Sequence, residues 1–423
     1  MTADLPERPA AVAEAPACLG CGAPLTRTLV DLGEQPLANS YVPLDQADAP
    51  EPVFPLHARV CDACLLVQVD RVTAPETFFN GNYAYFSSFS DSWLAHCRSY
   101  ADDMTARFGL GASSHVVEIA SNDGYMLQYF VARGVPVLGI EPAANVAAAA
   151  EAKGVSTKVA FFGLETAERL VAEGQQADLL AAKNVLAHVP DINDFVAGIP
   201  VLLKPDGVFT VEFPHLLRLI QQVQFDTIYH EHFTYLSLLA VRTVFERQGL
   251  EIFDVEEQPT HGGSLRVFAQ RRGAGRAASP AVEAVLAEER AADLDRPEGY
   301  EGFDERVRDV REGLLDYLHR AKAEGRVVAA YGAAAKGNTL LNYCGVTAED
   351  IAFVVDRNPA KQDTLLPGSH IPVRPVAALT AARPDDVLIL PWNLKREIRA
   401  QLGEAMPGWT GRTVTAVPAI DIA

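Results

Sequence analysis

The middle of the chain alternates short apolar runs with stretches of helical periodicity. Residues 116–119, Val-Val-Glu-Ile, are followed by the small, turn-prone Ala-Ser-Asn-Asp-Gly and then by a helical pattern over 125–133. A second largely apolar run, 135–141, ends on a carboxylate. Strand, tight loop, helix and strand in this order predict the opening unit of a doubly wound α/β sheet.

The same alternation continues along the chain and then starts again. Further strands of the first sheet are expected at 178–183, 207–213, 250–255 and 264–270, the last two as an antiparallel pair. A linker-like segment at 271–280 and amphipathic helical sequence to about residue 324 come next. A second sheet is expected from strands at 326–331, 351–356, 386–390 and 413–417. The predicted fold class is therefore α/β, with two sheets.

Two positions in the first unit suit a nucleoside ligand. Gly124 lets the backbone approach a ligand closely, and the N–H groups of the next helix face that ligand. Glu141, at the end of the second strand, is placed to accept hydrogen bonds from a ribose diol. The loop does not contain Gly-x-Gly-x-x-Gly, so it carries no dinucleotide fingerprint. An ordinary βαβ unit without a nucleoside is the alternative.

Four of the six cysteines form two Cys-x-x-Cys pairs, Cys18 with Cys21 and Cys61 with Cys64. Two pairs of this spacing bring four thiolates to one tetrahedral ion, and zinc binding supplies folding energy to a segment with little core. Four thiolate ligands leave no open position, so the expected zinc is structural. A redox pair or disulfides are the alternatives, and a chain without an export signal disfavours both.

The densest polar stretch, 225–233, carries Tyr229, His230, Glu231 and His232 between aromatic residues. Histidine, glutamate and tyrosine are the usual groups for proton transfer. The stretch does not have the i, i+4 histidine spacing of a helix-borne zinc site. A solvated loop is the alternative that composition leaves open.

Two further segments allow two readings each. The aromatic and polar run 78–88 contains Tyr83 and Tyr85, and it suits a lid over a pocket or packing between domains. The loop 332–336 precedes an expected helix, where phosphates bind, but its Lys336 stands before a glycine and so forms no Walker loop. A nucleotide diphosphate site and plain packing both fit this loop.

Composition removes several classes of function. The formal net charge is −19, whereas a general phosphate-backbone binder needs a basic face, so nucleic acid is not an expected partner. No apolar run of 18 residues occurs, so no membrane span is expected. Residues 1–16 have the composition of a disordered tail rather than of a signal peptide, and a cytoplasmic location is expected.

Taken in order, these motifs resemble the zinc-containing, S-adenosylmethionine-dependent C-methyltransferases that act on nucleotide-linked deoxysugars. The resemblance runs from Cys18 to about residue 417. Its most specific pieces are the two Cys-x-x-Cys pairs, Glu-Ile-Ala-Ser-Asn-Asp-Gly at 118–124, Tyr-His-Glu-His-Phe at 229–233, His-Gly-Gly at 261–263 and Tyr-Gly-Ala-x-Ala-Lys at 331–336. It implies a central class I methyltransferase domain of Rossmann-like fold.

The resemblance also implies an organisation and a substrate. The expected parts are a tail over 1–16, a zinc-binding module over 17–75, an S-adenosylmethionine-binding domain over 76–280, and a helical connector with a second Rossmann-like domain over 281–423. The implied substrate is a dTDP-linked 4-keto-6-deoxyhexose, methylated on a ring carbon next to the ketone, C3 or C5. The oligomeric state does not follow from the sequence, and a monomer is compatible with it.

Position within the motifs implies the site residues. S-adenosylmethionine is expected at Glu118, Ala120, Asn122, Gly124, Glu141 and Asn184. The sugar is expected at Tyr83, Tyr85, His188, Tyr229, Glu231 and His232, with Lys336 facing the nucleotide. One departure is Lys-Val-Ala-Phe-Phe at 158–162, which does not have the acid often found after the third strand of class I enzymes. A phenylalanine there is an alternative partner for the adenine, so the adenine contacts stay open.

Methylation of a sugar carbon sets its own chemical requirements. The carbon becomes a nucleophile only after it loses a proton, which the neighbouring ketone makes acidic by allowing an enolate. A base near the carbon, a donor near the ketone oxygen and an in-line sulfonium are therefore needed. His232 is the expected base, with Glu231 orienting it or acting itself and His188 in reserve. Tyr229 or Tyr85 is the expected donor.

Two other functions compete with this one. A small-molecule O- or N-methyltransferase needs no enolate and would not exchange a proton at a ring carbon. A zinc-containing protein that binds or modifies nucleic acid is opposed by the net charge, and it would show salt-dependent RNA binding.

Overall fold

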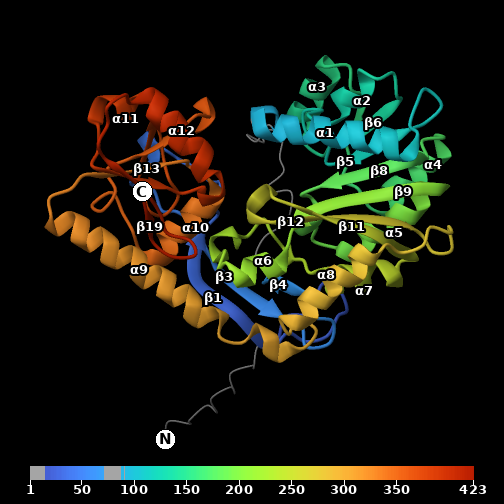
Figure 1. Cartoon of the computed structure of the whole chain (residues 1–423), viewed down its shortest axis with the longest axis horizontal. Helices are drawn as coiled ribbons and strands as arrows, with labels where there is room; N and C mark the ends of the chain where they lie inside the picture. Colours follow the sequence, from blue (N-terminus) through green and yellow to red (C-terminus); the bar gives the residue numbers. More distant parts are fainter. Residues whose placement is uncertain (1–14, 71–86, 90) are drawn as a thin grey trace, which may run out of the picture.

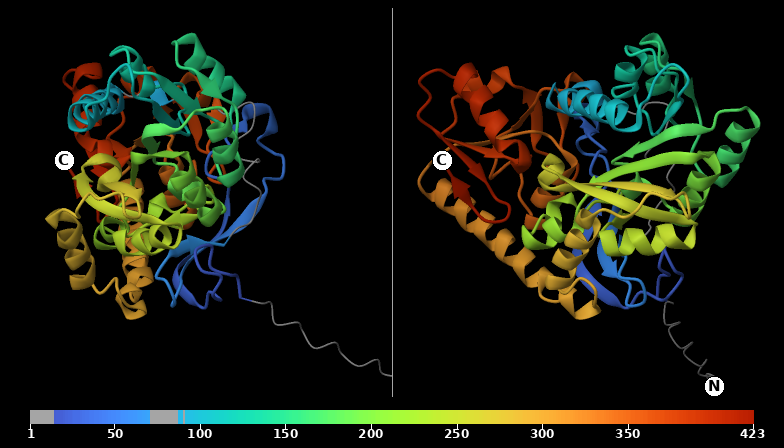
Figure 2. Two further views of the ribbon diagram at one scale, coloured as in Figure 1. Left: turned by 90° about the vertical axis from the view of Figure 1, so that its right-hand side faces the viewer. Right: turned by 45° about the vertical axis from the view of Figure 1, so that its right-hand side comes forward.

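The computed structural model describes residues 15–70, 87–89 and 91–423. Its strands form three sheets, which lie in three regions of the molecule (Figure 1). The N-terminal module is blue, the central domain runs from teal to yellow, and the C-terminal domain is red; a second direction of view separates them in the same way (Figure 2). Within these ranges, no helix combines the length and the apolar character that a membrane span needs.

The N-terminal module is a four-stranded antiparallel sheet. Its order is β1 (Arg27–Pro36), β3 (Val53–Val60), β4 (Val67–Val69) and β10 (Thr234–Tyr235). Alternate residues of β3, namely Leu56, Ala58 and Val60, are buried, as expected for a strand with one face on the core. Because β10 follows the polar stretch 225–233 directly, this sheet reaches that stretch of the central domain.

The central domain is a seven-stranded sheet of order β11-β12-β9-β8-β5-β6-β7. Its strands are β5 (Val116–Ile119), β6 (Val137–Ile140), β7 (Thr157–Lys158), β8 (Ala177–Lys183), β9 (Leu203–Pro214), β11 (Leu250–Gln258) and β12 (Ser264–Arg271). The first five run parallel, and β12 is antiparallel to both neighbours. The chain moves outward from β5 to β7 and then returns to β8, so the strand order switches beside β5. Ligands of such sheets bind at the carboxyl ends of the strands at this switch.

Helices cover both faces of the central sheet. The helices before β9 are α1 (Asp91–Phe108), α2 (Leu127–Val131), α3 (Ala144–Ala152), α4 (Leu164–Ala172) and α5 (Ile192–Leu202). Two more follow, α6 (Leu216–Gln221) and α7 (Leu238–Arg247). Side chains of α1, α2 and α3 form one core with the sheet, and those of α4, α5 and α7 form another. The strands between them are nearly continuous apolar runs, as the sequence predicted.

The C-terminal domain is a second α/β unit, as expected. Its parallel strands are β13 (Val328–Tyr331), β14 (Val354–Asp356), β16 (Pro372–Pro375), β17 (Asp386–Ile389) and β18 (Arg412–Thr415). Its antiparallel edge strands are β2 (Val42–Pro43), β15 (Thr364–Leu365) and β19 (Asp421–Ile422). Its helices are α10 (Ala335–Cys344), α11 (Ala377–Ala382) and α12 (Lys395–Ala405). Strand β2 comes from the N-terminal region of the sequence but pairs with β15 of this domain. The domain ranges expected from the sequence stay a prediction.

Short 3-10 turns and two connecting helices complete the chain. The turns are η1 (Leu44–Gln46), η3 (Ser87–Phe89), η4 (Leu186–His188), η5 (Phe225–Thr227), η6 (Thr260–Gly262), η7 (Pro297–Tyr300), η8 (Pro359–Lys361) and η9 (Trp392–Leu394). Helix α8 (Pro280–Ala291) packs on the central domain, and α9 (Phe303–Ala323) runs along the C-terminal domain (Figure 1).

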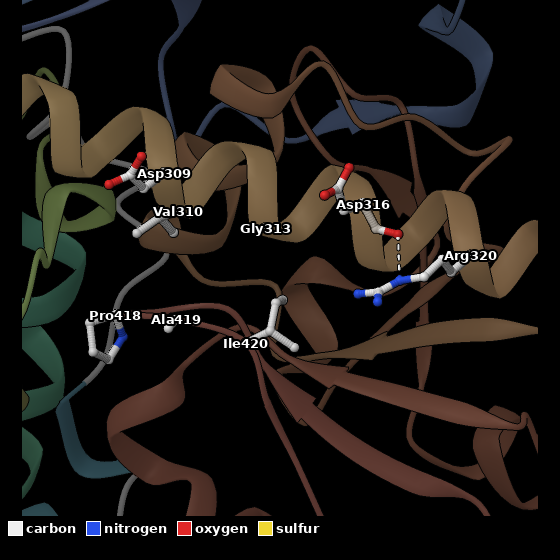
Figure 3. A pocket seen from close by; sticks show the side chains of 8 residues that line it. All are labelled: Asp309, Val310, Gly313, Asp316, Arg320, Pro418, Ala419 and Ile420. Carbon is white, nitrogen blue, oxygen red and sulfur yellow. Dashed lines mark hydrogen bonds between the residues drawn. The ribbon is translucent and has the colours of Figure 1, made fainter.

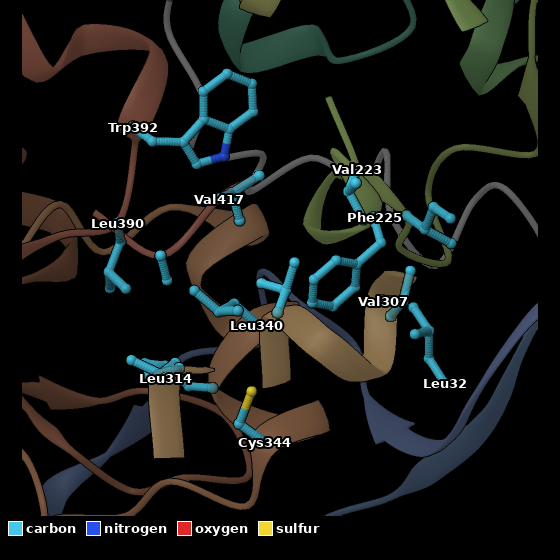
Figure 4. Packing of buried hydrophobic residues seen from close by; sticks show 14 of the residues in the cluster. Leu32, Val223, Phe225, Val307, Leu314, Leu340, Cys344, Leu390, Trp392 and Val417 are labelled. Carbon is cyan, nitrogen blue, oxygen red and sulfur yellow. The ribbon is translucent and has the colours of Figure 1, made fainter. Parts of the chain in front are cut away.

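One hydrophobic core joins the three regions. Leu32 of β1, Phe225 of the central domain, Val307 of α9, Leu340 of α10 and Trp392 all belong to it (Figure 4). A continuous core resists sliding of one part against another, since close-packed side chains transmit displacement rather than absorb it. The C-terminal domain is therefore held firmly against the region that carries the polar stretch.

Candidate active site and metal centre

Four cysteine sulfurs gather in the N-terminal module. The Sγ atoms of Cys18 and Cys64 are 3.5 Å apart, as are those of Cys21 and Cys61, and all four lie within 4.8 Å of one another. A tetrahedral zinc with Zn–S bonds of about 2.3 Å separates its sulfurs by roughly 3.8 Å. The four thiols, which form no disulfide, therefore fit the expected structural zinc.

Both cysteine pairs sit in turns of the same geometry. The N–H of Gly22 donates to the carbonyl of Cys18, and the N–H of Leu65 donates to the carbonyl of Cys61, both at 2.8 Å. Gly22 has φ of 75° and Leu65 has φ of 62°. Glycine adopts this left-handed conformation freely, whereas leucine does so at a cost. The turn at Cys61–Cys64 therefore has the same geometry as the first, although leucine rather than glycine occupies its left-handed position.

Glu141 lies at the carboxyl end of β6, where the sequence predicted a ribose acceptor. Its two oxygens accept from the backbone N–H groups of Asn122, at 3.0 Å, and Ala143, at 2.9 Å. Burial raises the pKa of Glu141, and these two donors oppose the rise. Each carboxylate oxygen has a further lone pair, so the fixed side chain still suits a diol.

The loop after β5 has an unusual backbone. Ala120 has φ of 55°, Asn122 has φ of 48° and Gly124 has φ of 74°. Non-glycine residues in the left-handed region are uncommon and collect at ligand-binding sites. A Cβ on Gly124 would lie 3.0 Å from the side chain of Val155, so the loop packs closely at that point.

Glu118 is a fully buried acid within β5, directly before this loop. Neither of its carboxyl oxygens has a hydrogen bond within standard geometry in the described part of the chain. Burial raises the pKa of Glu118 well above its usual value, while the Tyr125 hydroxyl and the Lys183 ammonium act in the opposite direction. Buried polar groups normally have a hydrogen-bond partner, so an unpaired carboxyl group at the switch point is better explained by contact with a polar ligand than by packing within the protein.

Asn184 follows β8 on the same side of the sheet. Its Nδ2 lies 3.1 Å from Nε2 of His261, and its Oδ1 has no partner among the described residues. The amide N–H donates, so Nε2 of His261 accepts. The ring of Trp93 lies edge-on to His261, 5.7 Å between centroids. His261 and Trp93 were not predicted as site residues, although the His-Gly-Gly motif marked the position of the first.

A buried ion network lies beside these residues. Glu212, at the end of β9, accepts from Lys183, from Nε of Arg266 at 2.6 Å, and from Nε2 of His96 at 2.9 Å. Burial acts to raise the pKa of Glu212, but Lys183, His96 and Arg266 outweigh it and hold the pKa low. The sequence did not predict this network, because only the pairing of β8, β9 and β12 brings its charges together.

The polar stretch brings Tyr229 and His232 together. Nδ1 of His232 lies 3.1 Å from the carbonyl oxygen of Thr227, and Nε2 lies 2.8 Å from the Tyr229 hydroxyl. A carbonyl only accepts, so Nδ1 carries the ring proton and the Nε2 lone pair accepts from Tyr229. The arrangement presents a proton acceptor, not a donor, on the Tyr229 side of the ring.

A second imidazole lies against the first. The His188 and His232 rings are 4.6 Å apart at an angle of 74°. Burial lowers the pKa of His188 to about 4. Burial also lowers the pKa of His232 well below its usual value, and electrostatic repulsion from His188, when that ring is protonated, and from the Lys336 ammonium adds to this. Both imidazoles are therefore neutral at pH 7 and can accept a proton.

The other two members of the stretch point elsewhere. Oε1 of Glu231 accepts from Nδ2 of Asn39 at 2.8 Å, and Nε2 of His230 lies 3.3 Å from backbone carbonyls of β3. Burial raises the pKa of Glu231, opposed by Asn39 and by the charge of Lys361. The contact that orients His232 in this structure is thus Thr227 rather than Glu231.

Lys336 enters the site from the C-terminal domain. It lies in the first turn of α10, where its Nζ donates to Oδ1 of Asn393 at 2.9 Å and sits 4.7 Å from the ring centre of Trp392. Its charge contributes to the lowered pKa values of His232 and His261. The predicted residues Tyr83 and Tyr85 fall at 71–86, outside the described residues.

A surface hollow of about 230 Å³ lies away from this site. It is lined by Asp309, Val310, Gly313, Asp316 and Arg320 of α9 and by Pro418, Ala419 and Ile420 (Figure 3). There, Nε of Arg320 donates a hydrogen bond to the backbone carbonyl oxygen of Asp316 at 3.2 Å. None of the predicted site residues lines this hollow.

Three family models match successive parts of the chain. A zinc binding domain matches residues 18–79, a methyltransferase domain matches 93–255, and a C-methyltransferase C-terminal domain matches 259–418. Two solved methyltransferases are similar to part of the chain at low sequence identity. CcbJ from Streptomyces caelestis is 14% identical with a TM-score of 0.37, covering 47% of this chain and 99% of its own. ChlM from Synechocystis PCC 6803 is 15% identical with a TM-score of 0.35, covering 42% and 83%.

Full-length similarity is much stronger. The C-methyltransferase NovU of Streptomyces niveus is 37% identical over 401 residues, which span 95% of each chain. A ubiquinone biosynthesis O-methyltransferase of Chelativorans sp. (strain BNC1) is 26% identical over 140 residues, 31% of this chain and 54% of that one. The chain therefore belongs to the family of S-adenosylmethionine-dependent C-methyltransferases that includes NovU, with a zinc-binding module ahead of its methyltransferase domain.

Proposed function

We propose that the enzyme methylates a carbon next to the ketone of a dTDP-linked 4-keto-6-deoxyhexose, at C3 or C5. The observation that carries the proposal is the neutral imidazole of His232, with its Nε2 lone pair toward Tyr229 and its Nδ1–H held by Thr227. An oxygen or nitrogen acceptor already has a lone pair, whereas a carbon must first lose a proton. A buried base of this kind therefore favours the carbon acid.

The switch-point loop is the proposed cofactor site. Glu141 holds the ribose diol, the backbone of Ala120, Asn122 and Gly124 lies against the nucleoside, and Asn184 faces the methionine part. Glu118, whose carboxyl oxygens have no hydrogen-bond partner among the described residues, belongs to the same site. Two further observations support this placement: the left-handed backbone of the loop and the unpartnered Oδ1 of Asn184. When bound, S-adenosylmethionine supplies an electrophilic methyl group on a sulfonium.

The proton transfer begins at His232. Nε2 takes the proton from the ring carbon, and the Tyr229 hydroxyl leaves Nε2 and donates to the developing enolate oxygen. The electron pair of the C–H bond becomes the enolate, which would then form the new C–CH3 bond with the methyl group that bound S-adenosylmethionine supplies, the sulfur being the leaving group. Nδ1–H keeps its bond to Thr227 throughout, so the ring does not turn. His188 and Glu231 stay as the reserve groups.

The C-terminal loop is the proposed place of the nucleotide. Lys336 stands in the first turn of α10, where helix N–H groups and the lysine charge both attract phosphate. Asn393 and Trp392 hold its chain in place. Tyr83 and Tyr85 are assigned to the sugar pocket by the motif alone. A cytoplasmic location stays a prediction, consistent with a nucleotide-linked substrate.

Product structure tests this function. The enzyme is incubated with S-adenosylmethionine and a small panel of dTDP-4-keto sugars, and products are analysed by mass and then by carbon NMR. The expected product gains a methyl group bonded to a ring carbon. A methyl signal in the O–CH3 or N–CH3 range would instead support the small-molecule O- or N-methyltransferase.

A further inference from the structure

The C-terminal domain touches the turn that precedes the polar stretch. Nε1 of Trp392, in η9, donates to Oδ2 of Asp226 in η5, at 2.7 Å. Asp226 is fully buried, and burial raises its pKa to about 6, opposed by Lys336 and Trp392. An ion or hydrogen-bond acceptor buried at a domain boundary needs its partner, and the described partner comes from the other domain.

A second contact holds the far side of the same turn. Oγ1 of Thr339, in α10, donates to the carbonyl oxygen of Ile228 at 3.0 Å. The ring of Tyr343, one turn further along α10, packs edge-on against Phe225 at 5.4 Å. Residues 225–228 therefore contact the C-terminal domain at both ends, through Trp392 on one side and α10 on the other.

Between these two contacts lies Thr227, whose carbonyl fixes His232. The direction of that carbonyl depends on the backbone at 226 and at 228, because each peptide plane is rigid and only φ and ψ turn. Trp392 holds residue 226 and Thr339 holds residue 228. Trp392 of the C-terminal domain is therefore connected to the imidazole of His232 through two consecutive residues, Asp226 and Thr227.

Trp392 also has a packing role that must be separated from its hydrogen bond. Its ring belongs to the shared core (Figure 4). The ring also lies so close to Gly262 that a Cβ on that residue would be 2.5 Å from Cη2 of Trp392. Phenylalanine keeps an aromatic ring but removes the N–H donor together with part of the indole that reaches Gly262, whereas variants of Asp226 leave the tryptophan in place and remove only the acceptor. The two roles can thus be tested apart.

We infer that Trp392 is a positioning residue: its hydrogen bond to Asp226 sets the Thr227 carbonyl and so holds the imidazole of His232. The inference rests on the proposed role of His232 as the base. It gives the C-terminal domain a task in the chemical step, in addition to the binding of a nucleotide.

The kinetic test compares Trp392→Phe with a matched control. Trp409 also donates its Nε1–H over 2.7 Å, to the carbonyl of Pro384 inside the C-terminal domain. Trp392→Phe is expected to lower kcat by about 10- to 100-fold, the range for a misplaced group, with the KM for the sugar unchanged. Trp409→Phe is expected to leave kcat within about twofold. An equal loss in both variants overturns the inference, because it indicates general destabilisation.

Two substitutions of Asp226 test the same hydrogen bond from the side of its acceptor. Asp226→Asn keeps an acceptor oxygen for Trp392 and is expected to retain most of kcat, whereas Asp226→Ala is expected to lose as much as Trp392→Phe. Retained kcat in Asp226→Ala overturns the inference.

A spectroscopic readout does not depend on turnover. In 15N-histidine-labelled enzyme, with the His232 signals assigned by their loss in His232→Gln, the wild type is expected to show the Nδ1–H tautomer. Trp392→Phe is expected to shift these signals toward a tautomer mixture, and Trp409→Phe is not. Unchanged His232 signals in Trp392→Phe overturn the inference. If no sugar is methylated by the wild type, the proposed function fails, yet the NMR result still decides the positioning.

Discussion

The Nδ1–H of His232 donates to the carbonyl oxygen of Thr227 at 3.1 Å. This single bond decides which nitrogen of the ring is free to accept, and Nε2 meets the Tyr229 hydroxyl at 2.8 Å. The ring is therefore prepared as a proton acceptor before any ligand arrives. Preorganisation of this kind lowers the barrier because the imidazole does not have to turn during the reaction.

The zinc centre is expected to hold about one zinc per chain. Cys61→Ser is expected to lose that zinc and to lower the temperature at which the N-terminal module unfolds, since metal binding contributes directly to the stability of small zinc modules. Cys97→Ala, at a buried thiol outside the cluster, is the matched control and is expected to keep the zinc. Metal analysis and thermal unfolding measure both. Purified enzyme without zinc and with all thiols reactive contradicts this prediction.

Zinc loss is also expected to reach the active site. The second cysteine pair leads into β4, and β4 pairs with β10, which starts two residues after His232. The N–H of Val69 donates to the carbonyl of Phe233 at 3.1 Å. In the zinc-free Cys61→Ser variant, the histidine NMR signals of His232 are expected to broaden or shift. Unchanged signals would show that the site is independent of the metal.

Glu141→Ala is expected to weaken S-adenosylmethionine binding by roughly 1–3 kcal/mol, the cost of leaving buried polar groups unpaired. The change leaves the backbone N–H groups of Asn122 and Ala143 without their acceptor. Glu151→Ala, at an exposed position on the neighbouring α3, is the control. Calorimetry measures both variants. Equal affinity in Glu141→Ala and wild type, or tight binding of NAD, would refute the cofactor assignment.

The pH dependence follows from the lowered pKa of His232. A base acts in its unprotonated form, so a pKa below the usual imidazole value keeps it active to lower pH. We expect kcat/KM to stay level from pH 8 to below 6.5. Lys336→Gln removes one of the positive charges that lower this pKa, so the acid limb of the profile is expected to move to higher pH.

The control for that profile is Lys395→Gln, at a lysine paired with Asp421 on the surface of the C-terminal domain. It is expected to leave the acid limb in place. A wild-type limb at pH 6.5 or above, or the same limb in Lys336→Gln and wild type, speaks against His232 as the titrating group.

The local pattern of hydrophobic residues predicted most strands of the central and C-terminal sheets. The strand, loop and helix at 116–133 were predicted from hydrophobic spacing and a single glycine, and the helix proved shorter, Leu127–Val131. The cysteine pairs were predicted from spacing alone. Strands β1, β3 and β4 of the N-terminal sheet and β16 of the C-terminal sheet were not predicted. Strands β2 and β10 were missed as well, because two residues are too few to show a period.

Contacts between distant residues could not be predicted in this way. Asp226 and Trp392 stand 166 positions apart, and no local feature of either indicates the other. Glu231 was expected to orient His232 or to act as the base itself, and no local feature indicated that its Oε1 accepts from Asn39 of the N-terminal module. Neighbours in a loop face different parts of the protein once the backbone turns, and that turn depends on tertiary packing.

Exchange of the sugar's α-proton with heavy water tests the central claim most directly. With S-adenosylhomocysteine in place of the methyl donor, wild-type enzyme is expected to incorporate deuterium at the ring carbon that it otherwise methylates. His232→Gln is expected to bind both ligands and to slow exchange and methyl transfer together by about 10²–10⁴-fold, the usual contribution of a general base. Exchange that survives in His232→Gln would assign the base to His188 or Glu231, and wild-type enzyme that methylates without any exchange would contradict the enolate account.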